Sequence, residues 1–117
     1  MAYIDACVTA VPSANREKYR EHARIAIEVL KDCGATRVWE GWGDDVPGGE
    51  VTSFPMAVKL EQDETVCVSW VMWPSREARD AGWQKLMADP RMSPESNPMC
   101  YDGKRMIFGG FEMLAEG

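Results

Sequence analysis

The chain has 117 residues, of which 45% are hydrophobic and 27% are charged, an ordinary balance for a globular protein with its own hydrophobic core. Its formal net charge of -6 argues against nucleic acid or an anionic membrane surface as the main partner. No apolar run approaches the ~20 residues of a membrane span, and the N-terminus lacks the basic and apolar segments of a signal peptide. We therefore expect a cytoplasmic protein with one domain spanning residues 1–117.

The first half of the chain predicts a strand, a helix and a second strand. Residues 3–11 alternate apolar and mixed side chains, which indicates a strand with one apolar face. An amphipathic helix follows, with Ser13 or Asn15 as the expected N-cap and Gly34 as the left-handed residue that ends it. Residues 35–43 then predict the second strand.

The second half contains the most apolar stretch, VCVSWVMW at residues 66–73. Alternate positions are apolar in either register, so we expect a strand that needs cover on both faces. Residues 53–60 before it are predicted to be extended, with Pro55 at an edge or a bulge. A second helix follows Ser75, which is the expected cap by residue type, and its apolar side includes Gly82, Leu86 and Met87.

A long connection separates this helix from the final strand, which is predicted at residues 106–114. The connection, residues 90–105, contains about 16 residues, and a loop of this length usually covers or binds something. Four cysteines, Cys7, Cys33, Cys67 and Cys100, form no Cys-x-x-Cys pair. Most fall in predicted elements, where a thiol behaves as a small hydrophobic group, so we expect them to be reduced.

The order strand-helix-strand, repeated once, predicts an α+β fold. It is the ferredoxin-like split βαβ arrangement, with two helices on one face of an antiparallel sheet. Tryptophans at 39 or 42 and at 70 or 73 leave apolar surface on the other face. Burial stabilises by about 25 cal/mol per Å2 of such surface, which favours a second copy packed face to face. A bound ligand or the long loop folded back are the alternatives.

Four segments of the sequence carry a family resemblance. They are WEGWGDDVPGG, VSWVMWPS, DPRM and YDGKRMIFGGFE, in this order. In order and spacing they closely resemble the YbaA-like family (DUF1428) of small bacterial proteins, which has no assigned function. The resemblance covers nearly the whole chain and implies a homodimeric α+β barrel, the class that also contains antibiotic-biosynthesis monooxygenases and haem-degrading enzymes. A shared barrel does not transfer their chemistry.

Three residues are candidates for acid–base catalysis. Asp5 and Glu40 lie on the mixed faces of predicted strands, and desolvation inside a barrel would raise their pKa values and suit them to proton transfer. The alternative is an ion pair or an edge position in water. His22, the only histidine, is a third candidate, although such a residue often lies on a solvated helix shoulder. With no second histidine, we expect neither a metal site nor a cofactor.

Four further residues are candidates for ligand binding. Trp42, Trp70 and Met72 would suit a flat apolar ligand, with core packing or dimer contact as the alternative. Arg105, in the segment DGKR, would suit an anion, unless it pairs with nearby acids in a turn. The sequence contains no phosphate-binding loop and no His-Glu-x-x-His motif.

Two hypotheses on function remain open. The first is a homodimer that binds a small apolar or aromatic molecule in a barrel cavity, with cofactor-independent oxidation or isomerisation. The second is a non-enzymatic interaction or stress-related protein whose sheet face serves only for dimerisation. A cavity that contains Asp5 and Glu40 would favour the first.

Overall fold

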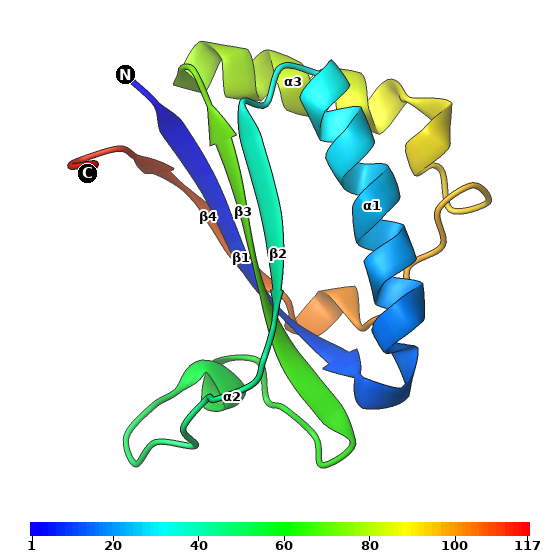
Figure 1. The fold of residues 1–117 in the computed structure, drawn as a ribbon, viewed down its shortest axis with the longest axis vertical. Coiled ribbons are helices and arrows are strands. Elements are labelled where there is room, and N and C mark those ends of the chain that lie inside the picture. The colour runs from blue at the N-terminus through cyan, green and yellow to red at the C-terminus, as the bar shows by residue number, and fades with distance from the viewer.

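The computed structural model describes residues 1–117 as one antiparallel sheet with two long helices on one of its faces (Figure 1). In chain order the elements are β1 (Tyr3–Pro12), α1 (Arg16–Asp32), β2 (Arg37–Trp42), α2 (Phe54–Ala57), β3 (Glu64–Trp73), α3 (Arg76–Ala88) and β4 (Ile107–Glu112). The strands lie in the order β2-β3-β1-β4. This order confirms the ferredoxin-like arrangement, because each half contributes one central and one edge strand.

Helix α1 packs on the sheet and ends where the sequence predicts. Tyr19, Ala23, Val29 and Leu30 are its buried residues, and Gly34 follows with a positive φ of 113°. Asn15 occupies the N-cap position, as predicted, but neither its side chain nor that of Ser13 makes the expected capping hydrogen bond. Ser13 instead pairs with the Thr65 hydroxyl at 2.7 Å, and the Asn15 amide donates to the Cys100 carbonyl at 3.0 Å. Both side chains are used to tie the start of α1 to other segments.

Helix α3 begins with a cap and packs closely on β3. The Ser75 hydroxyl accepts a hydrogen bond from the Ala78 amide at 3.1 Å, as a Ser at the N-cap should. Gly82 and Leu86 are the buried residues of the helix. Met87 was predicted to lie on the same side, but its side chain is 83% exposed. It lies one position beyond the buried row and faces away from the sheet.

The segment before β3 differs from its prediction. Residues 53–60 contain the short helix α2 rather than an extended strand. Ser53 caps this helix by accepting from the Met56 amide at 3.1 Å, and Pro55 occupies its first turn, where a missing amide hydrogen costs nothing. Local capping therefore overrides the apolar pattern. The turn then brings Val58 onto Ala10 and Val66 at one end of the sheet.

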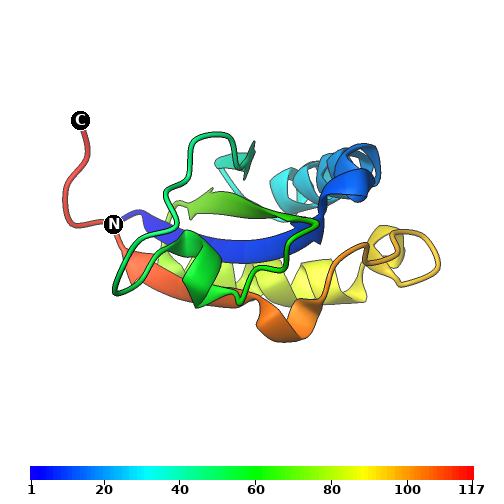
Figure 2. The ribbon, with the colours of Figure 1, turned by 90° about the horizontal axis from the view of Figure 1, so that it is seen from below.

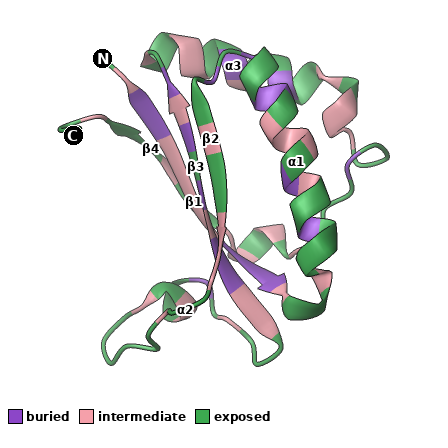
Figure 3. Ribbon diagram, viewed as in Figure 1, coloured by how far each residue is buried: buried purple, intermediate pink, exposed green.

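The two faces of the sheet receive different cover. Under the helices, Trp73 and Val71 belong to the largest buried cluster, together with residues of both helices. On the other side, which we call the open face, large apolar side chains remain exposed (Figure 3). From the strand register and the alternation of side chains, the open face consists of Ile4, Ala6, Val8, Arg37, Trp39, Gly41, Val68, Trp70, Met72, Ile107, Gly109 and Phe111.

Two tryptophans dominate the centre of the open face. Trp39 and Trp70 are register partners on β2 and β3, and their rings stack with centroids 5.6 Å apart. The loop with α2 lies on this side of the sheet, opposite α1 (Figure 1). Seen from below, the C-terminal tail projects away from the sheet (Figure 2). None of the helices combines the length and apolar character that crossing a membrane requires.

Candidate functional site

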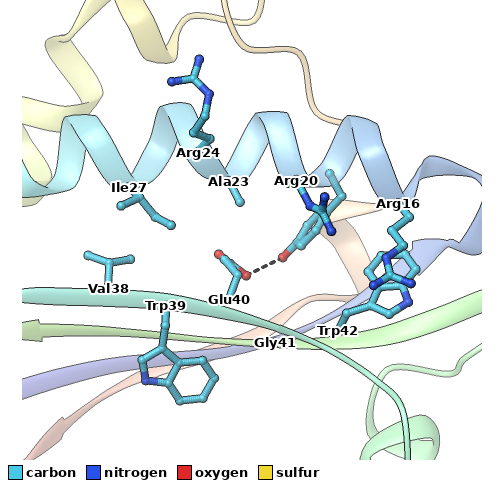
Figure 4. Close-up of a pocket in the computed structure, with 11 residues that line it drawn as sticks. Arg16, Arg20, Ala23, Arg24, Ile27, Val38, Trp39, Glu40, Gly41 and Trp42 are labelled. Carbon is cyan, nitrogen blue, oxygen red and sulfur yellow. Dashed lines mark hydrogen bonds between the residues drawn. The ribbon is translucent and has the colours of Figure 1, made fainter.

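A groove of about 430 Å3 lies between α1 and the edge strand β2 (Figure 4). The helix forms one wall with Arg16, Tyr19, Arg20, Ala23, Arg24 and Ile27. The strand forms the other wall with Val38, Trp39, Glu40, Gly41 and Trp42. Because β2 has no neighbour on its outer side, the groove is open along that edge.

The groove changes in character along its length. At one end the guanidinium of Arg16 lies over the Trp42 ring, 5.5 Å from the centroid. In the middle the Tyr19 hydroxyl donates a hydrogen bond to Glu40 Oε2 at 2.8 Å. At the other end lie the side chains of Ile27 and Val38 (Figure 4). Along the groove, the cation of Arg16 is therefore followed by the carboxyl group of Glu40 and then by the apolar end.

Glu40 is the only acid that lines the groove, and its surroundings alter its titration. Burial raises the pKa of Glu40 to about 7, and the hydrogen bond from Tyr19 opposes this shift. The residue as a whole is exposed in the single chain because one side of the groove is open. Solvent on that side reduces the size of the shift without reversing it, because the carboxyl end lies between α1 and the sheet.

Tyr19 stays protonated where Glu40 titrates. Burial, followed by the charge of Glu40, raises the pKa of the Tyr19 phenol far above its usual range. Its hydroxyl is therefore a fixed donor to Glu40. A carboxyl group that changes charge near neutral pH, oriented by a permanent donor and facing a cavity, is suited to general acid–base chemistry.

The strands behind Glu40 supply small polar groups and thiols rather than a nucleophile. Ser69 is the register partner of Glu40, and its hydroxyl lies 2.7 Å from Cys7 Sγ. Burial raises the pKa of Cys7, and raises that of Cys67 to about 12. Both thiols are therefore protonated at neutral pH, and a protonated thiol is a poor nucleophile. All four cysteines are free, as the sequence predicts.

Asp5 lies outside the groove, beneath α3. Its carboxylate accepts from the indole nitrogens of Trp73 at 2.9 Å and Trp83 at 2.7 Å, and pairs with Arg79 at 2.8 Å. An ion pair, which the sequence offered as an alternative, therefore exists, and its cation is Arg79. Three donors occupy both oxygens, so the geometry supports a structural role for Asp5.

His22 also lies outside the groove, on the side of α1 that the connection 90–105 covers. Its ring packs against Tyr19 and Tyr101, with centroids 6.4 and 5.5 Å away. Nδ1 is buried without a hydrogen-bond partner, and burial lowers the pKa of His22. Asn97 of the connection donates to the His22 carbonyl at 3.2 Å. The long loop thus covers α1, in line with its predicted role as a cover.

The four predicted ligand-binding residues do not converge. Trp42 lines the groove, whereas Trp70 and Met72 belong to the open face. Arg105 is held by both oxygens of Glu64 at 2.6 and 2.7 Å. Of all the predicted site residues, the structure brings together only Glu40 and Trp42.

Sequence reasoning missed the helix wall of the groove. The amphipathic pattern of α1 places Tyr19 in the apolar stripe and the arginines on the solvated side. Two signals were present: a buried Tyr hydroxyl needs a polar partner, and Arg16, Arg20 and Arg24 recur every four residues along one side of a helix. No group of three or more His, Cys, Asp or Glu side chains is arranged to hold a metal ion.

Comparison with known proteins identifies the family. The model of the family described as "Protein of unknown function (DUF1428)" matches residues 2–103. The chain belongs to the DUF1428 family. The uncharacterized protein YbaA of Escherichia coli K12 is 50% identical over 116 residues, covering 99% of both chains, and YbaA of Shigella flexneri is equally similar. These matches confirm the resemblance seen in the sequence.

A solved structure shares the fold of this DUF1428 chain. It is that of a dimeric ferredoxin-like protein from an uncultured marine organism, with a TM-score of 0.55 at 10% identity. The alignment covers 95% of this chain and 92% of the other. At this identity the likeness shows the fold alone, and it confirms the ferredoxin-like α+β class.

Proposed function

We propose that this protein binds a small apolar or aromatic molecule in the groove between α1 and β2 and isomerises it by proton transfer through Glu40. The observation that supports this most is the Glu40 carboxyl group, which faces the cavity, accepts from Tyr19 at 2.8 Å and has a pKa of about 7. Of the two reactions considered from the sequence, isomerisation requires neither an oxidant nor a cofactor. One proton leaves a carbon beside a carbonyl group and returns at another position.

Each wall of the groove has a part in this reaction. Near neutral pH Glu40 exists in both protonation states, so it can accept the proton and give it back. Tyr19 holds the carboxyl group in one orientation. Ala23, Ile27 and Val38 provide an apolar surface for the body of the substrate. A positioned carboxyl group of this kind contributes roughly 100- to 10,000-fold to a rate.

Proton exchange provides a direct test. The probe is 2-tetralone, an aromatic ketone, and the readout is the uptake of deuterium from D2O beside its carbonyl group, measured by NMR with and without protein. We expect the protein to accelerate the uptake and Glu40→Gln to reduce the acceleration about 100-fold. Glu21→Gln is the matched control, because Glu21 is exposed on α1 and pairs with Arg24. Equal rates for the wild type and Glu40→Gln would contradict the proposal.

We further propose that two copies associate through the open face. The support is the exposure of Trp39, Trp70, Ile107 and Phe111 on one side of the sheet, together with the dimeric state of the related ferredoxin-like protein. A stable pair needs about 800 Å2 from each partner. Sedimentation equilibrium at micromolar concentration should report twice the mass of the chain, and a single copy would contradict the assembly.

The open face also supports the second function considered from the sequence, a protein whose sheet serves only to dimerise. The two functions differ in the groove. If dimerisation is the whole function, the groove binds no small molecule and Glu40→Gln changes neither ligand binding nor exchange. The deuterium experiment therefore separates them.

A further inference from the structure

We infer that the ligand of the groove is an apolar monocarboxylate, whose single negative charge is held by Arg16 while its apolar body lies towards Ile27 and Val38. The inference rests on the proposed function, because it names the class of molecule that the same groove takes. It depends on three features of the groove, namely an uncompensated cation, an order of polarity along its length and the absence of a competing acid.

Arg16 differs from the other arginines of the groove in having no acidic partner. Arg20 pairs with Glu17 at 3.5 Å. Arg24 pairs with Glu21 at 2.8 Å and with Glu28 at 3.8 Å. Arg16 makes no ion pair and lies only over the Trp42 ring. In a chain with a net charge of -6, an unpaired guanidinium at the end of a cavity is a site for an anion.

The order of groups along β2 sets the length of the ligand. Strand residues rise by about 3.3 Å each, so Glu40 lies roughly 7 Å from Trp42 along the strand and Val38 roughly 13 Å from it. A molecule with its carboxylate at Arg16 would therefore carry its reactive carbon about 7 Å from that carboxylate, next to Glu40, and would end against Ile27. A bicyclic aromatic acid has these dimensions.

While Glu40 is protonated, the charges in the groove match one negative charge and no more. Arg16 is the one lining cation without an acid, and Glu40 is the one lining acid. Glu40 lies two residues from the end that holds Arg16, and its carboxyl group is already hydrogen-bonded to Tyr19. A monoanion at Arg16 completes the charge balance at that end. A dianion would leave one charge without a counterpart.

Two matched probes test the inference. They are 2-naphthoate and 2-naphthamide, which share one bicyclic body and differ in charge, and their affinities for the full-length protein are measured by calorimetry in low salt. We expect 2-naphthoate to bind at least about tenfold more tightly, corresponding to one charge-assisted contact. Arg16→Gln should remove this preference and Arg16→Lys should keep part of it. Arg76→Gln is the control that should leave it unchanged, because Arg76 lies on α3 outside the groove and pairs with Asp80.

The outcomes separate this inference from the proposed function. Equal binding of the two probes to the wild type, or an equal loss of preference in Arg16→Gln and Arg76→Gln, would overturn the inference while the groove remained a ligand site. If neither probe binds, both the inference and the proposed function fail. If 2-naphthoate is preferred but Glu40 catalyses no exchange, the inference stands and the proposed reaction fails. Circular dichroism of each variant checks that the fold is intact.

Discussion

The covered face and the open face of the sheet are made by alternate residues of the same strands, and the tryptophans of β3 show how they differ. Trp73 faces the helices, is 0% exposed and donates its indole hydrogen to Asp5 at 2.9 Å. Trp70, three residues earlier, faces the open side, is 39% exposed and stacks only on Trp39. The same type of side chain is thus enclosed and hydrogen-bonded on one face and bare on the other.

The proposed chemistry lies on one face of the sheet and the proposed assembly on the other. The covered face carries Asp5, Glu40 and the thiols of Cys7 and Cys67. Solvent is partly excluded there, which strengthens the interactions of charges and hydrogen bonds. The open face carries a single charged residue, Arg37, at one end. An apolar surface without carboxyl, imidazole or thiol groups can contribute burial energy but no proton transfer.

Of all the changes proposed, Trp70→Asp should have the largest effect, which is to weaken the association of two copies through the open face. The carboxylate would lose its water in the proposed dimer without gaining a partner, and each copy would carry one. We expect association to weaken about 1,000-fold, which corresponds to about 4 kcal/mol. Sedimentation equilibrium measures it. Met87→Asp, an apolar-to-acid change at an exposed site on α3, should leave the mass unchanged; a Trp70→Asp protein that still dimerises would contradict the assembly.

Replacing Asp5 by Asn should weaken the covered face by about 3 kcal/mol of unfolding free energy. The Asp5 side chain is 14% exposed, and removing its charge leaves the Arg79 guanidinium with less compensation inside the protein. Asp80 is the matched control, because it pairs with the same Arg79 at 3.0 Å from an exposed position. Asp80→Asn should stay within about 0.5 kcal/mol of the wild type. Urea denaturation measures both, and equal losses would show that burial does not distinguish the two pairs.

Gly82→Ala should destabilise the protein, because the added methyl group overfills the packing between α3 and the covered face. A Cβ there would lie 2.6 Å from Cη2 of Trp73, which is closer than packed atoms tolerate. Overpacking costs roughly 1–3 kcal/mol, and the better helix propensity of Ala returns about 1 kcal/mol, so we expect a net loss of about 1 kcal/mol. Gly48→Ala, where no atom lies within 4 Å, should be neutral. A stabilised Gly82→Ala protein would contradict the close packing.

A further prediction concerns the pH dependence of stability. The pKa of Glu40 is about 7 in the folded chain and 4.5 as its ordinary value, so between these values the folded state binds more protons than the unfolded state. The contribution of Glu40 to stability is therefore present below pH 4.5 and is lost as the pH rises to 7. Glu40→Gln should flatten this fall in thermal unfolding scans. An unchanged slope would indicate that Glu40 titrates normally.

The architecture was predictable because it depends on short-range patterns. The alternation in VCVSWVMW places Trp70 and Trp73 on opposite sides of one strand, and the lack of cover for one of them follows directly. Gly34 ended α1 for the same local reason. The helix α2 was missed where two local signals competed, the apolar pattern of residues 53–60 and the cap provided by Ser53 with Pro55.

The candidate site was only partly predictable because it depends on contacts between distant elements. Asp5 and Arg79 are separated by 74 positions in the chain, and no pattern in the sequence pairs them. Tyr19 and Glu40 were each assigned correctly to a helix and a strand, but their contact follows from how α1 lies across β2. The element and the face on which a residue lies can be predicted from its neighbours in the sequence, whereas its contact partners follow only from how the elements pack.

The position of β1 has a consequence for how the protein is made. Tyr3 is the register partner of Trp73 on one side and of Glu112 on the other. Strand β1 therefore gains one neighbour only after β3 has been synthesised, and the second only after β4 has been synthesised. At about 5–20 residues per second, its apolar residues remain without neighbours for seconds in each round of synthesis, so nascent chains of this protein should be substrates for ribosome-associated chaperones.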